Sequence, residues 1–298
     1  MAQSDVDVLI DVKNYYFIGN YQQCINEAQK LKGLGPDVGA VRDVFMYRAY
    51  IAFRKFTVVL DEVTNSSPKS IQPIRLFAEF ISAPLSRRDT VVEKLDKLVA
   101  SGFTSEDVTL IIVAGMIYHH VGNYEGALRA LNQGDHLECS ALTIQTLLAY
   151  DRLDLAKKEL KNMQEKDEDA TLTQLAAAWV SLATGGDKYQ EAFYIVQEMI
   201  DKYGSTSLLL NMLAACQIAQ GKYAEAESSL QESLDKDPNS ADALINLFMN
   251  SHFVGKPPEV ANRFLSQLKD ANPDHPFVQD HFKKEDEFER VAKLFTAA

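Results

Sequence analysis

The sequence predicts an all-α protein, an α-solenoid of about eight helix pairs stacked side by side, and three observations support it. A glycine followed within three residues by an aromatic residue, and then by a small residue, recurs four times, from Gly19, Gly122, Gly186 and Gly221. Gly19 and Gly122 lie 103 residues apart, Gly122 and Gly221 lie 99 apart, and Gly221 and Gly255 lie 34 apart. Apolar residues near these glycines recur at helical spacing. A period near 34 is typical of stacked helix pairs.

Each element of one repeat has a physical reason. Gly221 stands where one helix ends and the chain reverses, because glycine adopts the left-handed conformation without a Cβ clash. Ala226 stands where the second helix approaches the first closely, so a small side chain is needed. Leu230 and Leu234 follow on the same apolar face. Pro238 then ends the second helix, because proline cannot continue a helix interior.

These positions resemble a tetratricopeptide repeat, and the resemblance implies that fold for the chain. The segment from Ile111 to Leu131 matches the same pattern. Weaker copies begin near Val6, Ala40, Leu142, Leu172 and Leu244, and the last runs to Pro273. Because such repeats need one another to bury their faces, we expect one solenoid domain over residues 1–298.

Two regions depart from the repeat. Residues 70–102 have helical periodicity but lack the glycine turn and contain Ala83-Pro84 instead, after a polar loop at Thr64–Ser70. Residues 277–295 form an amphipathic stretch. We expect it to be a C-terminal helix that caps the open end of the stack with four apolar side chains: Phe282, Phe288, Val291 and Phe295.

Composition excludes several classes of function. The chain has 298 residues, 30 basic and 42 acidic side chains, and a formal net charge of −12. Nucleic-acid and anionic-lipid surfaces need clustered basic residues, so neither is expected as a direct partner. The longest apolar stretch, Leu110–Tyr118, is too short for a membrane span, and no secretory signal is visible. Three scattered cysteines predict reduced thiols in the cytosol.

No residue pattern predicts catalysis, a cofactor or a metal site. His119 and His120 are adjacent and point to different faces of a helix, and no fourth ligand completes a zinc set with His136 and Cys139. The glycines of Gly33–Gly39 follow a helix, whereas phosphate-binding loops follow a strand, so we expect an inter-repeat turn. The cysteines are expected to be buried packing residues.

The surface remains as the candidate site. In tetratricopeptide arrays the first helix of each pair lines the concave wall, and here its outward positions are largely apolar. If half of them were open, they would exceed the ~400 Å² patch that a soluble surface tolerates without a partner. We therefore predict that this wall holds an apolar protein segment; the alternative is that the array curls and the wall packs on itself. The predicted contacts are Leu9, Tyr16, Phe17, Ile112, Met116, Leu208, Asn211, Ile245, Met249 and Phe253.

Some tetratricopeptide proteins bind a C-terminal carboxylate through a clamp of Lys, Asn and Arg on this wall. Only Lys13, Arg48 and Asn211 are polar candidates here, and they fall in three different repeats. The pattern therefore disfavours a carboxylate clamp.

Over its whole length the chain also resembles the coatomer epsilon subunit family. The resemblance depends on Asp11–Tyr16, Gly122–Leu128 and Asn272–Pro276, together with the length and the repeat layout. It implies a non-catalytic coat subunit that binds and stabilises the C-terminal region of the alpha subunit of coatomer, in Golgi-to-ER retrograde and intra-Golgi transport. It also implies a ring-like array and a cytoplasmic protein, peripheral at Golgi membranes and coated vesicles. The alternative is a soluble tetratricopeptide adaptor that binds short peptide tails.

Overall fold

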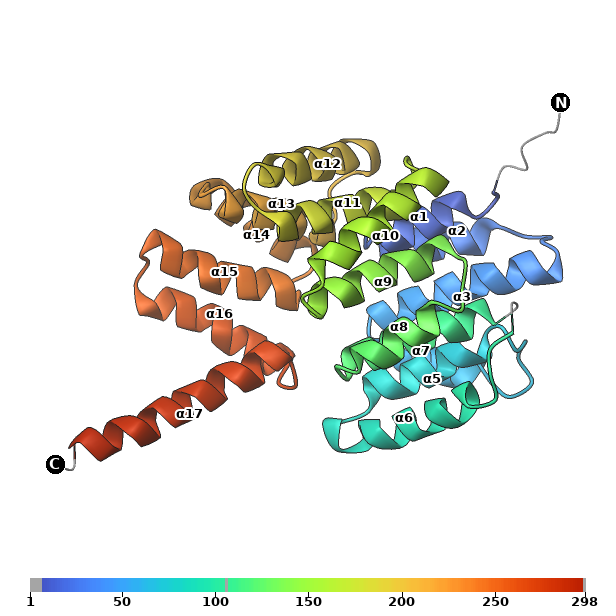
Figure 1. The fold of residues 1–298 in the computed structure, drawn as a ribbon, viewed down its shortest axis with the longest axis horizontal. Coiled ribbons are helices and arrows are strands. Elements are labelled where there is room, and N and C mark those ends of the chain that lie inside the picture. Colours follow the sequence, from blue (N-terminus) through green and yellow to red (C-terminus); the bar gives the residue numbers. More distant parts are fainter. Residues whose placement is uncertain (1–6, 105–106, 297–298) are drawn as a thin grey trace. The chain divides into compact units, whose positions relative to one another are not determined.

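The protein is an array of antiparallel helix pairs in a computed structural model that describes residues 7–104 and 107–296 (Figure 1). Within those residues it has seventeen α-helices and no strand, so the predicted eight pairs plus a C-terminal helix are confirmed. The pairs are α1 (Ile10–Phe17) and α2 (Tyr21–Lys30), α3 (Pro36–Ala52) and α4 (Phe56–Glu62), α5 (Gln72–Ser82) and α6 (Leu85–Val99), α7 (Val108–His120) and α8 (Tyr124–Leu131), α9 (Leu137–Ala149) and α10 (Leu153–Lys166), α11 (Thr171–Thr184) and α12 (Lys188–Tyr203), α13 (Ser207–Ala219) and α14 (Tyr223–Lys236), and α15 (Ala241–Val254) and α16 (Pro258–Ala271), followed by α17 (Pro276–Thr296).

Internal contacts divide the chain within α12, into an N-terminal unit that ends at Ile195 and a C-terminal unit that begins at Val196. From α1 to α11 in the first unit, and from α13 to α17 in the second, each helix packs on the next along the chain. The single domain expected from the sequence stays a prediction, and the two units are described separately below.

The turns inside six of the eight pairs share one hydrogen-bond pattern, and the exceptions are α5–α6 and α11–α12. At Gly221, with φ +75°, the glycine N–H donates to Ile218 O and the next N–H, of Lys222, donates to Gln217 O, each at 2.9 Å. This arrangement satisfies carbonyls at the end of α13 and requires a left-handed residue. The predicted turn glycines Gly19, Gly122 and Gly255 also have positive φ. Asp151 replaces glycine in the α9–α10 turn, at φ +60°, with the same pair of bonds to Leu148 O and Leu147 O.

Small residues allow the two helices of a pair to approach closely. Ala127 and Ala226 are fully buried, as the repeat pattern predicts. Gly115 of α7 faces Leu131 of α8 so closely that a Cβ there would lie 2.5 Å from a Leu131 methyl carbon. Gly115 therefore sets the separation of α7 and α8.

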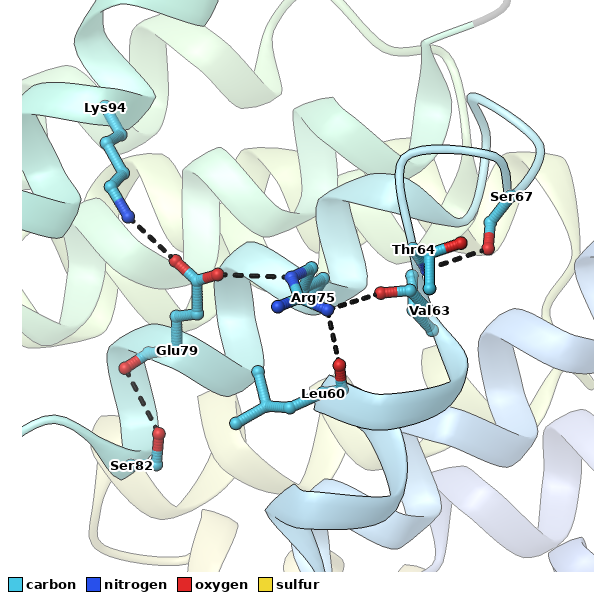
Figure 2. Close-up of polar contacts among 8 residues, drawn as sticks. All are labelled: Leu60, Val63, Thr64, Ser67, Arg75, Glu79, Ser82 and Lys94. Atoms are coloured by element: carbon cyan, nitrogen blue, oxygen red, sulfur yellow. Dashed lines mark hydrogen bonds and ion pairs between the residues drawn. The ribbon is translucent and has the colours of Figure 1, made fainter.

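The irregular pair α5–α6 has the predicted Ala83-Pro84 turn and a polar network that the sequence did not predict (Figure 2). Arg75 of α5 donates to Val63 O at 2.7 Å and to Leu60 O, so it satisfies carbonyls at the end of the seven-residue helix α4. Its Nε also lies 3.3 Å from Glu79 Oε1, and Lys94 of α6 binds the other Glu79 oxygen at 3.0 Å. These bonds connect α4, α5 and α6.

The loop before α3 is shorter than expected. We expected residues 33–39 to form an inter-repeat turn, but α3 begins at Pro36 and includes the last four of them. Proline at the first helical position needs no N–H partner and already has a helical φ, so it starts α3.

The C-terminal helix α17 caps the stack only through its first turns. Val278 is buried, and Phe277 and Phe282 pack on the core of the C-terminal unit, with Lys269 Nζ 4.0 Å from the centre of the Phe282 ring. The expectation that three further side chains take part in capping is wrong. Figure 1 shows α17 continuing past α16, and the side chains of Phe288, Val291 and Phe295 are exposed.

The left-handed turns give a stability prediction. Replacing Asp151 with Gly should raise the free energy of unfolding by about 0.5–1 kcal/mol, because glycine adopts φ +60° without the steric cost that a side chain carries. The matched opposite change, Gly122→Ala, should lower it by a similar amount, since no atom lies within 4 Å of the added Cβ and only the backbone cost remains. Urea denaturation followed by circular dichroism measures both. Equal stability of the two variants would contradict the conclusion that Asp151 and Gly122 occupy the same left-handed turn position.

Candidate partner-binding wall

The predicted contacts fall on the first helices of four pairs or next to them. Leu9 is the N-cap residue of α1. The remaining nine lie inside helices: Tyr16 and Phe17 in α1, Ile112 and Met116 in α7, Leu208 and Asn211 in α13, and Ile245, Met249 and Phe253 in α15. Five therefore belong to each unit, and the two units treat them differently.

In the N-terminal unit the first helices contact one another in a closed cycle. Each of α1, α3, α5, α7, α9 and α11 contacts the next in this order, and α11 contacts α1. Thr171 Oγ1 of α11 donates to Asn14 Oδ1 of α1 at 2.8 Å, although the two residues are 157 positions apart. The wall of this unit therefore curls far enough to pack on itself.

A buried ion pair lies inside this cycle. The Arg48 guanidinium of α3 donates to both carboxylate oxygens of Glu138 in α9, from Nη1 to Oε2 at 3.2 Å and from Nη2 to Oε1. Both side chains are almost completely buried, and the Tyr16 ring lies 4.4 Å from the guanidinium carbon. Burial alone would lower the pKa of Arg48, but the Glu138 carboxylate outweighs it and holds that pKa above its usual range. The arginine is therefore a permanently charged, neutralised link across the unit.

Aromatic packing closes the rest of the N-terminal wall. The Phe45 ring meets Tyr16 and Phe17 edge-on, with ring centroids 5.5 and 5.6 Å away, and Phe17 also packs on the apolar cluster of α9–α11. Leu9 and Ile112 are only 2% and 6% exposed. Their prediction as partner contacts is therefore corrected, because the chain itself covers them. The self-packing alternative accounts for these two side chains, while Tyr16, Phe17 and Met116 are half-buried.

In the C-terminal unit, the apolar side chains near the C-terminal end of α15 remain exposed on the wall. Met249 and Phe253 of α15 are 38% and 52% exposed, and the adjacent Val254 is 46% exposed. The Phe253 ring stacks on Tyr223 at 5.3 Å, so it is held in place while one side remains accessible. Leu208 and Asn211 of α13 and Ile245 of α15 are half-buried.

The three polar residues considered for a carboxylate clamp all have partners within the chain. Lys13 Nζ binds Asp7 Oδ2 at 2.7 Å, Arg48 binds Glu138, and Asn211 Oδ1 accepts from Asn246 Nδ2 at 2.9 Å. A peptide carboxylate would have to displace each partner, so the contacts disfavour the clamp as the sequence did.

Burial keeps the three cysteine thiols protonated, and His119 and His120 have hydrogen-bond partners within the chain. Burial raises the pKa of Cys24 to about 12, and that of Cys139 and of Cys216 to about 11, so these thiols stay protonated near neutral pH. His119 Nδ1 lies 3.1 Å from Thr146 Oγ1, and His120 Nδ1 lies 2.9 Å from Met116 O. Across the described part of the chain, no three acidic, histidine or cysteine side chains are placed to hold a metal ion.

Comparisons with known proteins identify the family. The family model for the coatomer epsilon subunit matches residues 5–296. The rice (Oryza sativa subsp. japonica) coatomer subunit epsilon-2 is 39% identical over 97% of this chain and 98% of its own length. The Caenorhabditis elegans coatomer subunit epsilon is 35% identical over 96% and 98%. This chain belongs to the coatomer epsilon subunit family. It is therefore a component of the coatomer coat, as the resemblance of its sequence predicted.

Solved structures support the repeat class. A tetratricopeptide repeat protein from Parabacteroides merdae superposes with a TM-score of 0.59 at 14% identity, over 89% of this chain and 98% of its own. The Cut9–Hcn1 assembly of the APC/C gives 0.58 at 13% identity, over 93% and 55%. These likenesses show the fold alone. For this coatomer epsilon family member, membership in the family indicates a structural rather than a catalytic protein. None of its described helices combines the length and apolar character needed to cross a membrane.

Sequence reasoning missed the role of Glu138. The only signal was an acidic residue beside the buried Cys139 in an apolar first helix, and Arg48 stood out only as a polar wall residue. Neither observation indicates that Arg48 and Glu138, which are 90 positions apart, bind each other.

The ion pair gives a test by double substitution. Arg48→Met should lower the free energy of unfolding by about 3–5 kcal/mol, because it leaves the Glu138 carboxylate buried without its partner. The double variant Arg48→Met/Glu138→Met should recover most of that loss, since an apolar pair replaces both charges. Urea denaturation of the wild type and three variants measures the cycle. A double variant as unstable as the sum of the two single ones would contradict the coupling.

The half-buried His119 gives a pH prediction. Burial and then the neighbouring His120 lower the pKa of His119 below 6.5. The unfolded chain therefore binds a proton more readily than the folded one, and stability falls as pH drops through about 6.5. When the pH is lowered from about 7.5 to 5.5 at constant salt, the melting temperature of His119→Gln should therefore fall less than that of the wild type. An equal loss in both proteins would contradict it.

Proposed function

We propose that this protein is the coat subunit that binds and stabilises the C-terminal region of the alpha subunit of coatomer. One observation carries the proposal: the open apolar end of the wall in the C-terminal unit, formed by Met249, Phe253 and Val254. Clustered large apolar side chains on a soluble surface are typical of a binding site. Membership in the coatomer epsilon family supports a coat chain as the partner.

Within each unit, the proposed contacts are the half-buried and exposed members of the predicted set. In the C-terminal unit, Ile245 lies one helical turn before Met249 on α15, and Leu208 lies on the neighbouring helix α13. Asn211 and Asn246 add a hydrogen-bonded amide pair that can exchange bonds with a partner backbone. Tyr16, Phe17 and Met116 of the N-terminal unit stay in the proposed set, but with less accessible surface.

The proposed biological role follows from the family. We infer that the protein acts in retrograde transport from the Golgi to the endoplasmic reticulum and within the Golgi. It would be cytoplasmic, and peripheral at Golgi membranes and coated vesicles through the complex alone. The net charge of −12 disfavours direct binding to anionic lipid or to nucleic acid.

A transient peptide-tail adaptor is the second candidate. The partnered state of Lys13, Arg48 and Asn211 disfavours recognition of a terminal carboxylate. The two candidates differ in behaviour: a coat subunit should gain stability from its partner, because binding favours the folded state. An adaptor should be monodisperse alone and bind short peptides at micromolar strength.

The open end of the wall gives the test. Met249→Asp/Phe253→Asp in the full chain should weaken binding to the C-terminal region of the alpha subunit at least about 100-fold, because both side chains would place a charge in an apolar contact. The control is Leu85→Asp/Leu98→Asp, which makes the same change at two exposed leucines of α6. Co-expression, size-exclusion chromatography and titration measure binding, and circular dichroism checks folding. Unchanged binding by the folded wall variant would place the site elsewhere.

A further inference from the structure

The helix α17 has two parts with different surroundings. Up to Phe282 it packs on the C-terminal unit, and from Lys283 onward nearly every described side chain is exposed. Phe288, Leu294 and Phe295 are 74%, 72% and 80% exposed, more than any other large apolar side chain in the described part of the chain. Figure 1 shows this part as a helix that continues past α16. It therefore exposes apolar surface that the capping contact does not use.

The apolar side chains of this part fall on one face. Phe288 and Phe295 are seven residues apart and Val291 lies three after Phe288, which is the spacing of a coiled-coil seam. We call Phe288, Val291 and Phe295 the α17 stripe. Lys284 continues the stripe toward the core and pairs with Asp280 at 2.6 Å. The free part, residues 283–295, is about 20 Å long, enough for nearly two heptads.

The first half of the α17 stripe has acidic edges, whereas Ala292 and Leu294 hold the corresponding edge positions of its second half. At heptad spacing, Glu285 flanks the stripe on one side, and Asp280 and Glu287 flank it on the other. The basic residues Arg290 and Lys293 fall on the opposite side of the helix. A partner helix packed on the stripe would therefore meet a carboxylate on each side of its first half, at Glu285 and Glu287.

We propose that the α17 stripe docks an amphipathic helix of another coat chain, with an apolar seam bordered by Lys or Arg. Such a helix buries the exposed phenylalanines and pairs its basic borders with Glu285 and Glu287, as flanking charges do in coiled coils. The α17 stripe lies on a different helix from the wall of α13 and α15. The inference rests on the proposed function in one respect: the partner is sought among the coat chains.

The charges of α17 disfavour two other occupants. In a parallel pair with a second copy, Asp280 would face Glu285. In an antiparallel pair that sets Phe288 against Val291, Glu285 and Glu287 would face Ala292 and Leu294, so neither arrangement gives these carboxylates a basic partner. A lipid surface favours amphipathic helices whose apolar face has basic borders, whereas the first half of this stripe has acidic borders.

Two variants with the same change in net charge test the edges. Glu285→Lys/Glu287→Lys reverses the borders of the stripe, and the matched control Asp286→Lys/Glu289→Lys reverses two carboxylates that lie farther from it. The labelled full chain is titrated into a coat complex assembled without this subunit. The border variant should bind at least about tenfold more weakly, less so in high salt, and the control within about twofold of wild type. Equal effects of the two variants, or none, would overturn the proposal.

Cross-linking identifies the occupant. Val291→p-benzoylphenylalanine in the assembled coat should cross-link to a helix of another chain that carries basic residues beside its apolar seam. Cross-links only to a second copy, to lipid or to the N-terminal unit of the same chain would each overturn the proposal. Failure of the proposed function looks different: wild type would then not bind the alpha C-terminal region, whatever the α17 variants do.

Discussion

No helix pair in this chain can bury its apolar face alone, and the rest of the structure follows from that constraint. Each pair needs a tight turn, a close approach and a neighbour. The left-handed turn at Gly221 and the fully buried Ala226 provide the first two in α13–α14. A neighbour is harder to provide, because no adjacent pair covers the two ends of the stack or its inner wall. The N-terminal and C-terminal units meet this requirement in different ways.

The N-terminal unit covers its wall with its own helices. Contact between α11 and α1 completes the cycle, and the Arg48–Glu138 pair connects α3 with α9 inside it. Such a pair contributes little net stability, because the cost of taking both charges out of water offsets their attraction. Its geometry is demanding, however, since the guanidinium must meet both carboxylate oxygens. We therefore assign the pair to fixing how far the unit curls, while aromatic packing around Phe45 provides the apolar burial.

The parts of the fold that depend on local chemistry could be predicted from the sequence. Glycine turns, buried alanines and the Ala83-Pro84 break each express a backbone or steric limit at one position. Asp151 escaped prediction as a left-handed residue because an aspartate also suits right-handed conformations. Leu9 and Ile112 were misjudged because an outward position on a first helix does not reveal whether another helix covers it. The link from Arg48 to Glu138 spans 90 positions, so no local pattern contains it.

The exposed apolar surface of the C-terminal unit makes it the natural side for binding. Met249 and Phe253 lie open on its wall and Phe288 and Phe295 on its last helix, whereas the corresponding wall residues Leu9 and Ile112 of the N-terminal unit are covered. Apolar surface stays in water only at a cost of about 25 cal/mol per Å², so each open patch favours association. The two patches also differ in kind, since the first half of the α17 stripe has acidic borders and the wall has an amide pair beside it. Substitutions at the covered residues Leu9 and Ile112 should therefore act through folding, and those at the open patches through assembly.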